Sequence, residues 1–239
     1  NASAIQLTDT ENTPSKRFDL MHSINVRGTF LVVQHALPYL KKSSHAHILT
    51  LSPPINLAPK WLGPHVAYTL SKYDMSMLTL GWAEEFKDDQ IACNSLWPRT
   101  TIDTAAVRNL LGGEMLANMS RTPAIIADAA LFILSKEKLQ YTGKTFIDED
   151  VLAAEGITDL AHYSVVPGAK LFYDLFYHLD HPSQMLGNNL SFSKHNDVFD
   201  NIKHPSNAYY QIHRRLCLYC IPSYHKDRIR QDYHHYSFE

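Results

Sequence analysis

The sequence predicts an α/β protein in which a parallel sheet carries helices on its faces. Two observations support this prediction. Segments with a strand pattern alternate along residues 13–147 with helical segments of more than about ten residues, and this alternation is typical of parallel strands joined by crossover helices. At 239 residues and with 45% hydrophobic side chains, the chain is also long enough to bury the core that such a sheet requires.

The first half of the chain contains one expected strand between two expected helices. Thr13 and Pro14 are typical of a helix start and a broad apolar face follows them, so a helix is expected over residues 13–40. Residues 46–52 suit a short strand because they are β-prone and end at two prolines. After a loop, a second helix is expected over residues 65–86.

The second half repeats this pattern. Residues 90–97 form the second expected strand, residues 123–134 a helix that opens with a proline, and residues 144–147 the third strand, which comes after a glycine turn. The acidic residues 148–150 are expected to form a solvated turn. Because ligands of parallel sheets bind beyond the carboxyl ends of the strands, Ser52 and the segments after the later strands are the first candidates for a functional site.

The composition of the chain changes at about residue 180. Residues 1–180 keep the apolar patterning of a globular domain, whereas residues 181–239 are polar, contain seven of the 14 histidines and show neither the strand nor the helix period. We therefore expect one domain followed by a poorly ordered tail that is rich in histidine and tyrosine.

Charge and cysteine content exclude several classes of function. The formal net charge of −2 argues against electrostatic binding to nucleic acid or to a membrane surface. No apolar run approaches the ~18 residues of a membrane span, so a soluble intracellular protein is expected. The three cysteines, Cys93, Cys217 and Cys220, do not form a disulfide framework and suit a reducing compartment.

Tyr68 and Lys72 stand four positions apart in the second expected helix, where they share one face about a turn apart. A tyrosine has a pKa of ~10, too high for acid/base catalysis at neutral pH, but an adjacent ammonium favours the phenolate and lowers that pKa. The same lysine offers donors to a cofactor hydroxyl. Taken alone, the spacing also fits a pair on the surface of an amphipathic helix.

The order of these features resembles the short-chain dehydrogenase/reductase family, in which a Tyr-x-x-x-Lys pair follows a catalytic serine. The segment Asn1-Ala-Ser-Ala4 resembles the end of the family's Asn-Asn-Ala-Gly segment. Residues 24–30 resemble the helix that bears the family's catalytic asparagine, here Asn25, and residues 94–98 resemble the strand that leads to its nicotinamide loop. The order and spacing of these motifs over residues 1–150 make the resemblance specific.

The resemblance implies roles for four side chains. Tyr68 is the general acid/base, and Lys72 binds the nicotinamide ribose and lowers the pKa of the tyrosine. Asn25 holds a water that links the lysine to solvent, and Ser52 orients the substrate oxygen. Pro53 stands where the family places a second serine, which leaves open that Ser52 is only a structural residue at the strand end. For Asn25, the alternative is a helix cap or a polar residue on the surface.

The resemblance also implies contacts with the cofactor at Asn1, Pro98 and Thr101, in addition to those of Tyr68 and Lys72. The nicotinamide loop departs from the family's Pro-Gly pattern because Arg99 replaces the glycine, and Thr104 is an alternative to Thr101 as the contact to the carboxamide. No metal site is expected.

The family's Gly-rich turn, which brings the pyrophosphate to a helix N-terminus, has no counterpart in this sequence. The chain has nine glycines, but none forms Gly-x-x-x-Gly-x-Gly near its start. By the resemblance, the expected fold is the C-terminal part of a Rossmann-type doubly wound parallel sheet. The strand at 46–52 would then have an exposed, aggregation-prone edge, and the chain alone would not bind NADPH with micromolar affinity.

The function that the resemblance implies is that of a fragment of an oxidoreductase. It interconverts a hydroxyl and a carbonyl on a lipid-like small molecule, uses NADP with NAD left open, resides in peroxisomes or mitochondria, and forms a homo-oligomer. The expected partners include neither nucleic acid nor membrane.

Two alternatives remain open. The chain is a catalytically inactive truncated product that binds a partner through its exposed sheet edge, or its tail holds zinc through Cys217 and Cys220 with His213 and His225 nearby. A single Cys-x-x-Cys motif is weak support for zinc.

Overall fold

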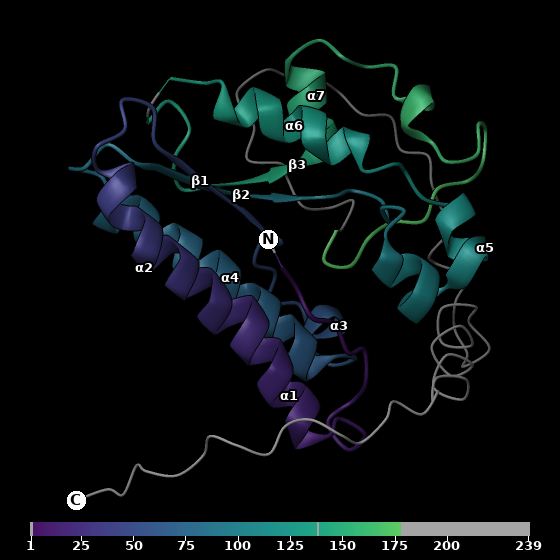
Figure 1. Ribbon diagram of the computed structural model, residues 1–239. Helices are drawn as coiled ribbons and strands as arrows, with labels where there is room; N and C mark the ends of the chain where they lie inside the picture. The colour runs from purple at the N-terminus through teal and green to yellow at the C-terminus, as the bar shows by residue number, and fades with distance from the viewer. Residues whose placement is uncertain (1, 138, 178–239) are drawn as a thin grey trace, which may run out of the picture. The chain divides into compact units, whose positions relative to one another are not determined.

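The computed structural model describes residues 2–137 and 139–177 (Figure 1). Asn1, the predicted tail at 181–239 and the zinc alternative at Cys217 and Cys220 lie outside the described residues.

One parallel sheet forms the centre of the fold. Its strands are β1 (His47–Leu51), β2 (Ala92–Trp97) and β3 (Lys144–Ile147), in the order β1-β2-β3, and both pairs of neighbours are parallel. All three strands end at the same edge of the sheet, because their last residues pair within one position of each other. The predicted α/β fold with a parallel sheet is confirmed.

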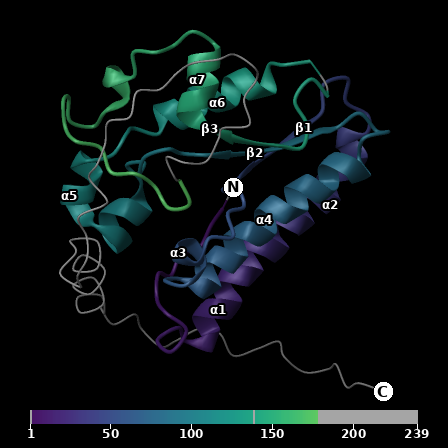
Figure 2. The same cartoon turned by 180° about the vertical axis from the view of Figure 1, so that it is seen from behind.

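Helices cover both faces of this sheet. On one face lie α2 (Thr29–Leu40) and α4 (Val66–Glu85), and on the other lie α6 (Ala124–Leu134) and α7 (Asp148–Ala154), as the two opposite views show (Figures 1 and 2). The alternation of side chains along each strand sends every second residue into one of the two cores. The first core contains Val33, Ala46, Ile48, Trp82, Ala83, Phe86, Ile91 and Cys93, and the second is built around Leu96, Ala129, Ile133 and Val151.

The predicted helix over residues 13–40 is continuous but changes its winding in the middle. It consists of α1 (Ser15–Met21), the π-helical turn η1 (His22–Gly28) and α2. Asn25 lies in η1 and is fully buried there. A π-helical turn re-aims side chains relative to an ideal helix and is frequent at functional sites.

Several short helical elements were not predicted from the sequence, because each is too short to show a helical period. They are α3 (Pro59–Leu62), η2 (Val107–Leu111), α5 (Gly113–Asn118) and η3 (Ala161–Tyr163). The described helices include none with both the length and the apolar character needed to cross a membrane.

The expectation of a solvated turn at residues 148–150 is wrong. These residues open α7 directly after β3, and the Asp148 side chain is fully buried. Acidic side chains in the first turn of a helix are favoured by the helix dipole. Their partners are the two arginines Arg99 and Arg121, which lie far away in the sequence.

Candidate active site

The predicted pair of Tyr68 and Lys72 lies in the first two turns of α4, buried against the sheet. Only 5% of Tyr68 and 4% of Lys72 is exposed. A surface pair on an amphipathic helix would be mostly solvated, so the burial of both side chains contradicts that alternative. The two groups therefore lie in a water-poor site.

The Lys72 ammonium is held at the carboxyl ends of two strands. Its Nζ donates to the carbonyl oxygen of Leu51 at 3.0 Å and lies 5.3 Å from the centroid of the Trp97 ring. Burial lowers the pKa of Lys72 to about 8, an effect that the carboxylate of Asp174 opposes. The Lys72 Nζ also donates to Met75 Sδ at 3.8 Å, so one of the three donors of the ammonium is left for a ligand hydroxyl.

The expected lowering of the Tyr68 pKa by Lys72 is wrong for this structure. Burial of the phenol raises the pKa of Tyr68, and the carboxylate of Asp174 raises it further. Desolvation outweighs the ammonium because it penalises the phenolate in a site that excludes water. Tyr68 therefore keeps its proton at neutral pH, which is the form that donates to a carbonyl oxygen.

Asn25 ties the start of the chain to α4. Its Oδ1 accepts from the backbone N–H of Ala4 at 2.7 Å, and its Nδ2 donates to the Ala4 carbonyl oxygen at 2.9 Å and to the Ser71 hydroxyl at 3.0 Å. Ser71 in turn donates to the carbonyl oxygen of Tyr68 at 2.8 Å. Asn25 is thus neither a helix cap nor a surface residue. A water-holding role stays a prediction, and only the second lone pair of Oδ1 is left for it.

Ser52 is fully buried directly after β1. The Ser52 Oγ lies 3.2 Å from the Thr50 Oγ1, which in turn lies 2.6 Å from the Thr79 Oγ1 on α4. Thr79 is about three turns beyond Tyr68 on the helix. These contacts fit the structural alternative for Ser52, and its role in orienting a substrate stays a prediction.

The segment after β2 holds two of the predicted cofactor contacts. Pro98 is half-buried directly behind Trp97. The Thr101 hydroxyl lies 2.7 Å from that of Ser120, and the backbone N–H of Thr101 donates to the Phe172 carbonyl oxygen at 2.8 Å. Thr101 thus anchors a remote segment to β2, and its contact with a cofactor stays a prediction.

Arg99, which replaces a glycine of the family pattern, links the ends of β2 and β3. Its backbone N–H donates to Asp148 Oδ1 at 2.9 Å, and its guanidinium pairs with Glu149 at 3.3 Å and with Asp150. Burial raises the pKa of Asp148 to about 7, although two backbone N–H groups oppose the shift.

Replacing Asp148 by asparagine is expected to stabilise the protein above pH ~7 by on the order of 1–3 kcal/mol. The unfolded carboxyl has a pKa near 3.8 and the folded one near 7, so the folded state binds more protons between these values. The free energy of unfolding therefore falls as pH rises through this window, and an amide abolishes that fall. Urea unfolding at several pH values measures it, with Asp150→Asn as the more exposed control. An unchanged pH slope would contradict the buried, protonated state of Asp148.

Residues 172–177, which we call the strap, were not anticipated as part of the site. The backbone N–H of Asp174 donates to the Arg99 carbonyl oxygen at 3.0 Å, and the Phe176 ring packs against Tyr68. The strap lies more than a hundred residues beyond Tyr68 in the sequence. No spacing or motif connects the two, so only the folded chain reveals the contact.

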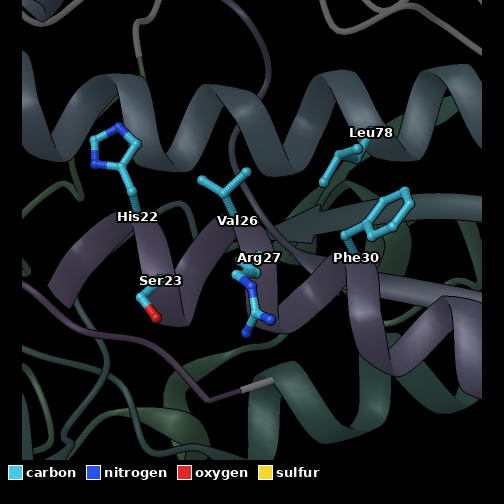
Figure 3. A pocket seen from close by; sticks show the side chains of 6 residues that line it. All are labelled: His22, Ser23, Val26, Arg27, Phe30 and Leu78. Carbon is cyan, nitrogen blue, oxygen red and sulfur yellow. The ribbon is translucent and has the colours of Figure 1, made fainter. Parts of the chain in front are cut away.

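A separate apolar groove of about 420 Å³ lies between η1 and α4 (Figure 3). Its lining consists of His22, Ser23, Val26, Arg27, Phe30 and Leu78. None of these is a predicted site residue, so the groove does not belong to the candidate active site.

The chain is similar to proteins of known sequence and known structure. A family model described as enoyl-(acyl carrier protein) reductase matches residues 1–149. Hydroxysteroid dehydrogenase-like protein 2 from Xenopus tropicalis is 55% identical over 176 residues, which cover 74% of this chain and 42% of the relative. The human protein of the same name is 52% identical over 176 residues, which cover 74% of this chain and 41% of the relative. The chain thus spans about two fifths of the length of these relatives.

Two solved structures are similar in both sequence and fold. A dehydrogenase from Xanthomonas campestris is 49% identical with a TM-score of 0.71, over 74% of this chain and 65% of the other. A short chain dehydrogenase from Mycobacterium thermoresistibile is 51% identical with a TM-score of 0.70, over 79% of this chain and 66% of the other.

Proposed function

The chain belongs to the short-chain dehydrogenase/reductase family, and from this premise we propose that it acts in a nicotinamide-dependent oxidoreductase that interconverts a hydroxyl and a carbonyl group. The observation that carries the proposal is the buried pair of Tyr68 and Lys72 at the carboxyl ends of β1 and β2. This is the position at which ligands of parallel sheets bind.

In the proposed reaction, Tyr68 donates its proton to the carbonyl oxygen of the substrate. The burial that raises the pKa of Tyr68 keeps the phenol protonated, which is the form that can donate. When bound, the nicotinamide supplies the hydride. The Lys72 ammonium, aimed between the end of β1 and the Trp97 ring, stabilises negative charge that develops on the phenol and donates to a ribose hydroxyl.

The described residues fit the nicotinamide end of a dinucleotide. The fit rests on Lys72, a buried cation whose ammonium keeps one donor beside the strand ends that Leu51 and Met75 do not use. The sequence offers no Gly-rich turn for the pyrophosphate. The residues that would hold the cofactor are therefore those around the nicotinamide ring and its ribose.

The substrate proposed is a lipid-like molecule. Support comes from the apolar rings next to Tyr68, because Trp61, Tyr73, Trp97 and Phe176 all belong to one cluster with it. NADP rather than NAD, a location in peroxisomes or mitochondria, and a homo-oligomeric state are further proposals that rest on the family resemblance.

Titration of the complete gene product with NADPH and with NADH, followed by fluorescence, tests the proposal. Its length is first established by mass spectrometry of peptides upstream of Asn1. We expect saturable binding and reduction of a carbonyl substrate by the complete product, and no micromolar binding of NADPH by residues 1–239 alone. Failure of the complete product to bind either dinucleotide would instead support the alternative of a binding protein without catalysis.

A further inference from the structure

The strap crosses the candidate active site on a path fixed by hydrogen bonds. The Phe172 N–H donates to the Met119 carbonyl oxygen at 2.9 Å, Tyr173 forms an antiparallel bridge with Thr100, and the indole N–H of Trp97 donates to the Leu175 carbonyl oxygen at 2.8 Å. These bonds hold the strap to the segment that leaves β2 and bring its end above Tyr68.

Phe176 then inserts its ring among four aromatic side chains. Its ring centroid lies 5.3 Å from that of Tyr73, 5.9 Å from Trp97, 6.2 Å from Trp61 and 6.4 Å from Tyr68. Only 2% of Phe176 is exposed. The four partners come from α3, α4 and β2, so the ring fills a space that the fold builds from separate elements.

The backbone of Phe176 is strained in this position. Its φ is +69°, in the left-handed region that a bulky side chain rarely adopts. Such a conformation persists only where the surroundings impose it, and it is most frequent at binding and switching segments. The packing of the ring therefore holds the strap in a conformation that its backbone does not favour.

The Phe176 ring covers one approach to Tyr68. A general acid must come within hydrogen-bonding distance of the oxygen that it protonates, but Tyr68 is 5% exposed and lies stacked against the Phe176 ring. A group that reaches the Tyr68 phenol from this side must displace that ring. Only a flat apolar group recovers the contacts with Trp61, Tyr73 and Trp97 that are lost when Phe176 leaves.

We propose that Phe176 is a specificity-determining residue that occupies the substrate site until a flat, ring-bearing ketone or alcohol takes its place. The proposal rests on the proposed function and names its substrate class. Small aliphatic ketones cannot replace the ring contacts and are rejected. Because binding requires the Phe176 ring to be displaced, the apparent affinity for the ligand equals the intrinsic affinity multiplied by the fraction of molecules in which the ring is out of the site.

Binding of 2-acetylnaphthalene, a flat aryl ketone, tests the proposal without any cofactor. Trp61 and Trp97 report on the site through quenching of their fluorescence, and Trp82→Phe removes the remaining tryptophan, which lies near the opposite end of α4 in another core cluster. In this background, Phe176→Gly is expected to bind the ketone about tenfold more tightly or better, because the competing ring is absent. Glycine accepts the positive φ, so the strap keeps its path.

The matched control is Tyr173→Ala, which removes an aromatic side chain from the same strap outside the cluster around Tyr68. It is expected to change the affinity for 2-acetylnaphthalene less than about twofold. Equal affinities of Phe176→Gly and the parent protein, or an equal gain in the control, would overturn the proposal.

A second measurement uses the protein without substitutions. Displacement of Phe176 exposes it to chymotrypsin, so 2-acetylnaphthalene is expected to speed cleavage after this residue. Saturable quenching with an unchanged cleavage rate would refute displacement of Phe176.

Failure of the proposed function can be told apart from failure of this inference. The proposed function alone fails if Tyr68→Phe retains turnover while the binding results for 2-acetylnaphthalene are as expected. The inference alone fails if Tyr68→Phe loses turnover but Phe176→Gly leaves the preference for 2-acetylnaphthalene over acetone unchanged.

Discussion

Replacing Tyr68 by phenylalanine is expected to lower kcat for carbonyl reduction at least about a hundredfold, because the only group lost is the hydroxyl that delivers the proton. The ring, its burial and its contact with Phe176 remain. Dinucleotide affinity should change little, since Lys72 keeps its bond to Leu51 and its place over Trp97. Steady-state kinetics and dinucleotide titrations on the complete gene product measure both quantities.

Tyr73→Phe is the matched control for this substitution. Tyr73 lies on the same helix, is buried to a similar degree, and donates its hydroxyl to the Asn56 carbonyl oxygen at 2.7 Å. Its loss is expected to lower the free energy of unfolding by about 1 kcal/mol and to leave kcat within a few fold. If the two variants lose turnover equally, or if Tyr68→Phe retains it, Tyr68 is not the acid of the reaction.

Replacing Asn25 by alanine is expected to lower the free energy of unfolding by about 2–4 kcal/mol, since three hydrogen bonds of a buried side chain are lost together. The substitution leaves both backbone groups of Ala4 and the Ser71 hydroxyl without this partner. Urea unfolding monitored by circular dichroism measures the change. Because Ser71 lies between Tyr68 and Lys72 on α4, a smaller loss of catalytic rate is expected to accompany it.

Ser23→Ala provides the control for Asn25, since Ser23 lies on the exposed side of the same π-helical turn. It is expected to change the free energy of unfolding by less than about 0.5 kcal/mol. A similar, small effect of Asn25→Ala would show that the link between the start of the chain and α4 contributes little to stability.

The elements that the sequence predicted well are those whose pattern is local. The predicted ends of the strand at residues 46–52 and of the helix over 65–86 agree within two residues with those of β1 and α4. The reason is that a strand or helix with one buried face repeats apolar residues at a fixed spacing in the sequence. Tyr68 and Lys72 are placed on one face of α4 by the same local geometry. Both side chains are buried because α4 packs against the sheet, and the spacing of apolar residues in the sequence does not predict this contact.

The missed features depend on contacts between distant segments. Asp148 was expected in a solvated turn but is buried beside Arg99, and the pKa of Tyr68 is set by burial and Asp174 rather than by the neighbouring lysine. A four-residue spacing reports which groups share a helix face, but it carries no information about the water that they lose on folding.

Local patterns and motifs are thus sufficient to predict the parallel α/β architecture, the family and the pairing of Tyr68 with Lys72. What covers that pair becomes visible only in the folded chain: the strap, with Phe176 among rings from α3, α4 and β2. The physical reason is that secondary structure is encoded by neighbouring residues, whereas the shape and dielectric of a site are set by side chains that only the folded chain brings together.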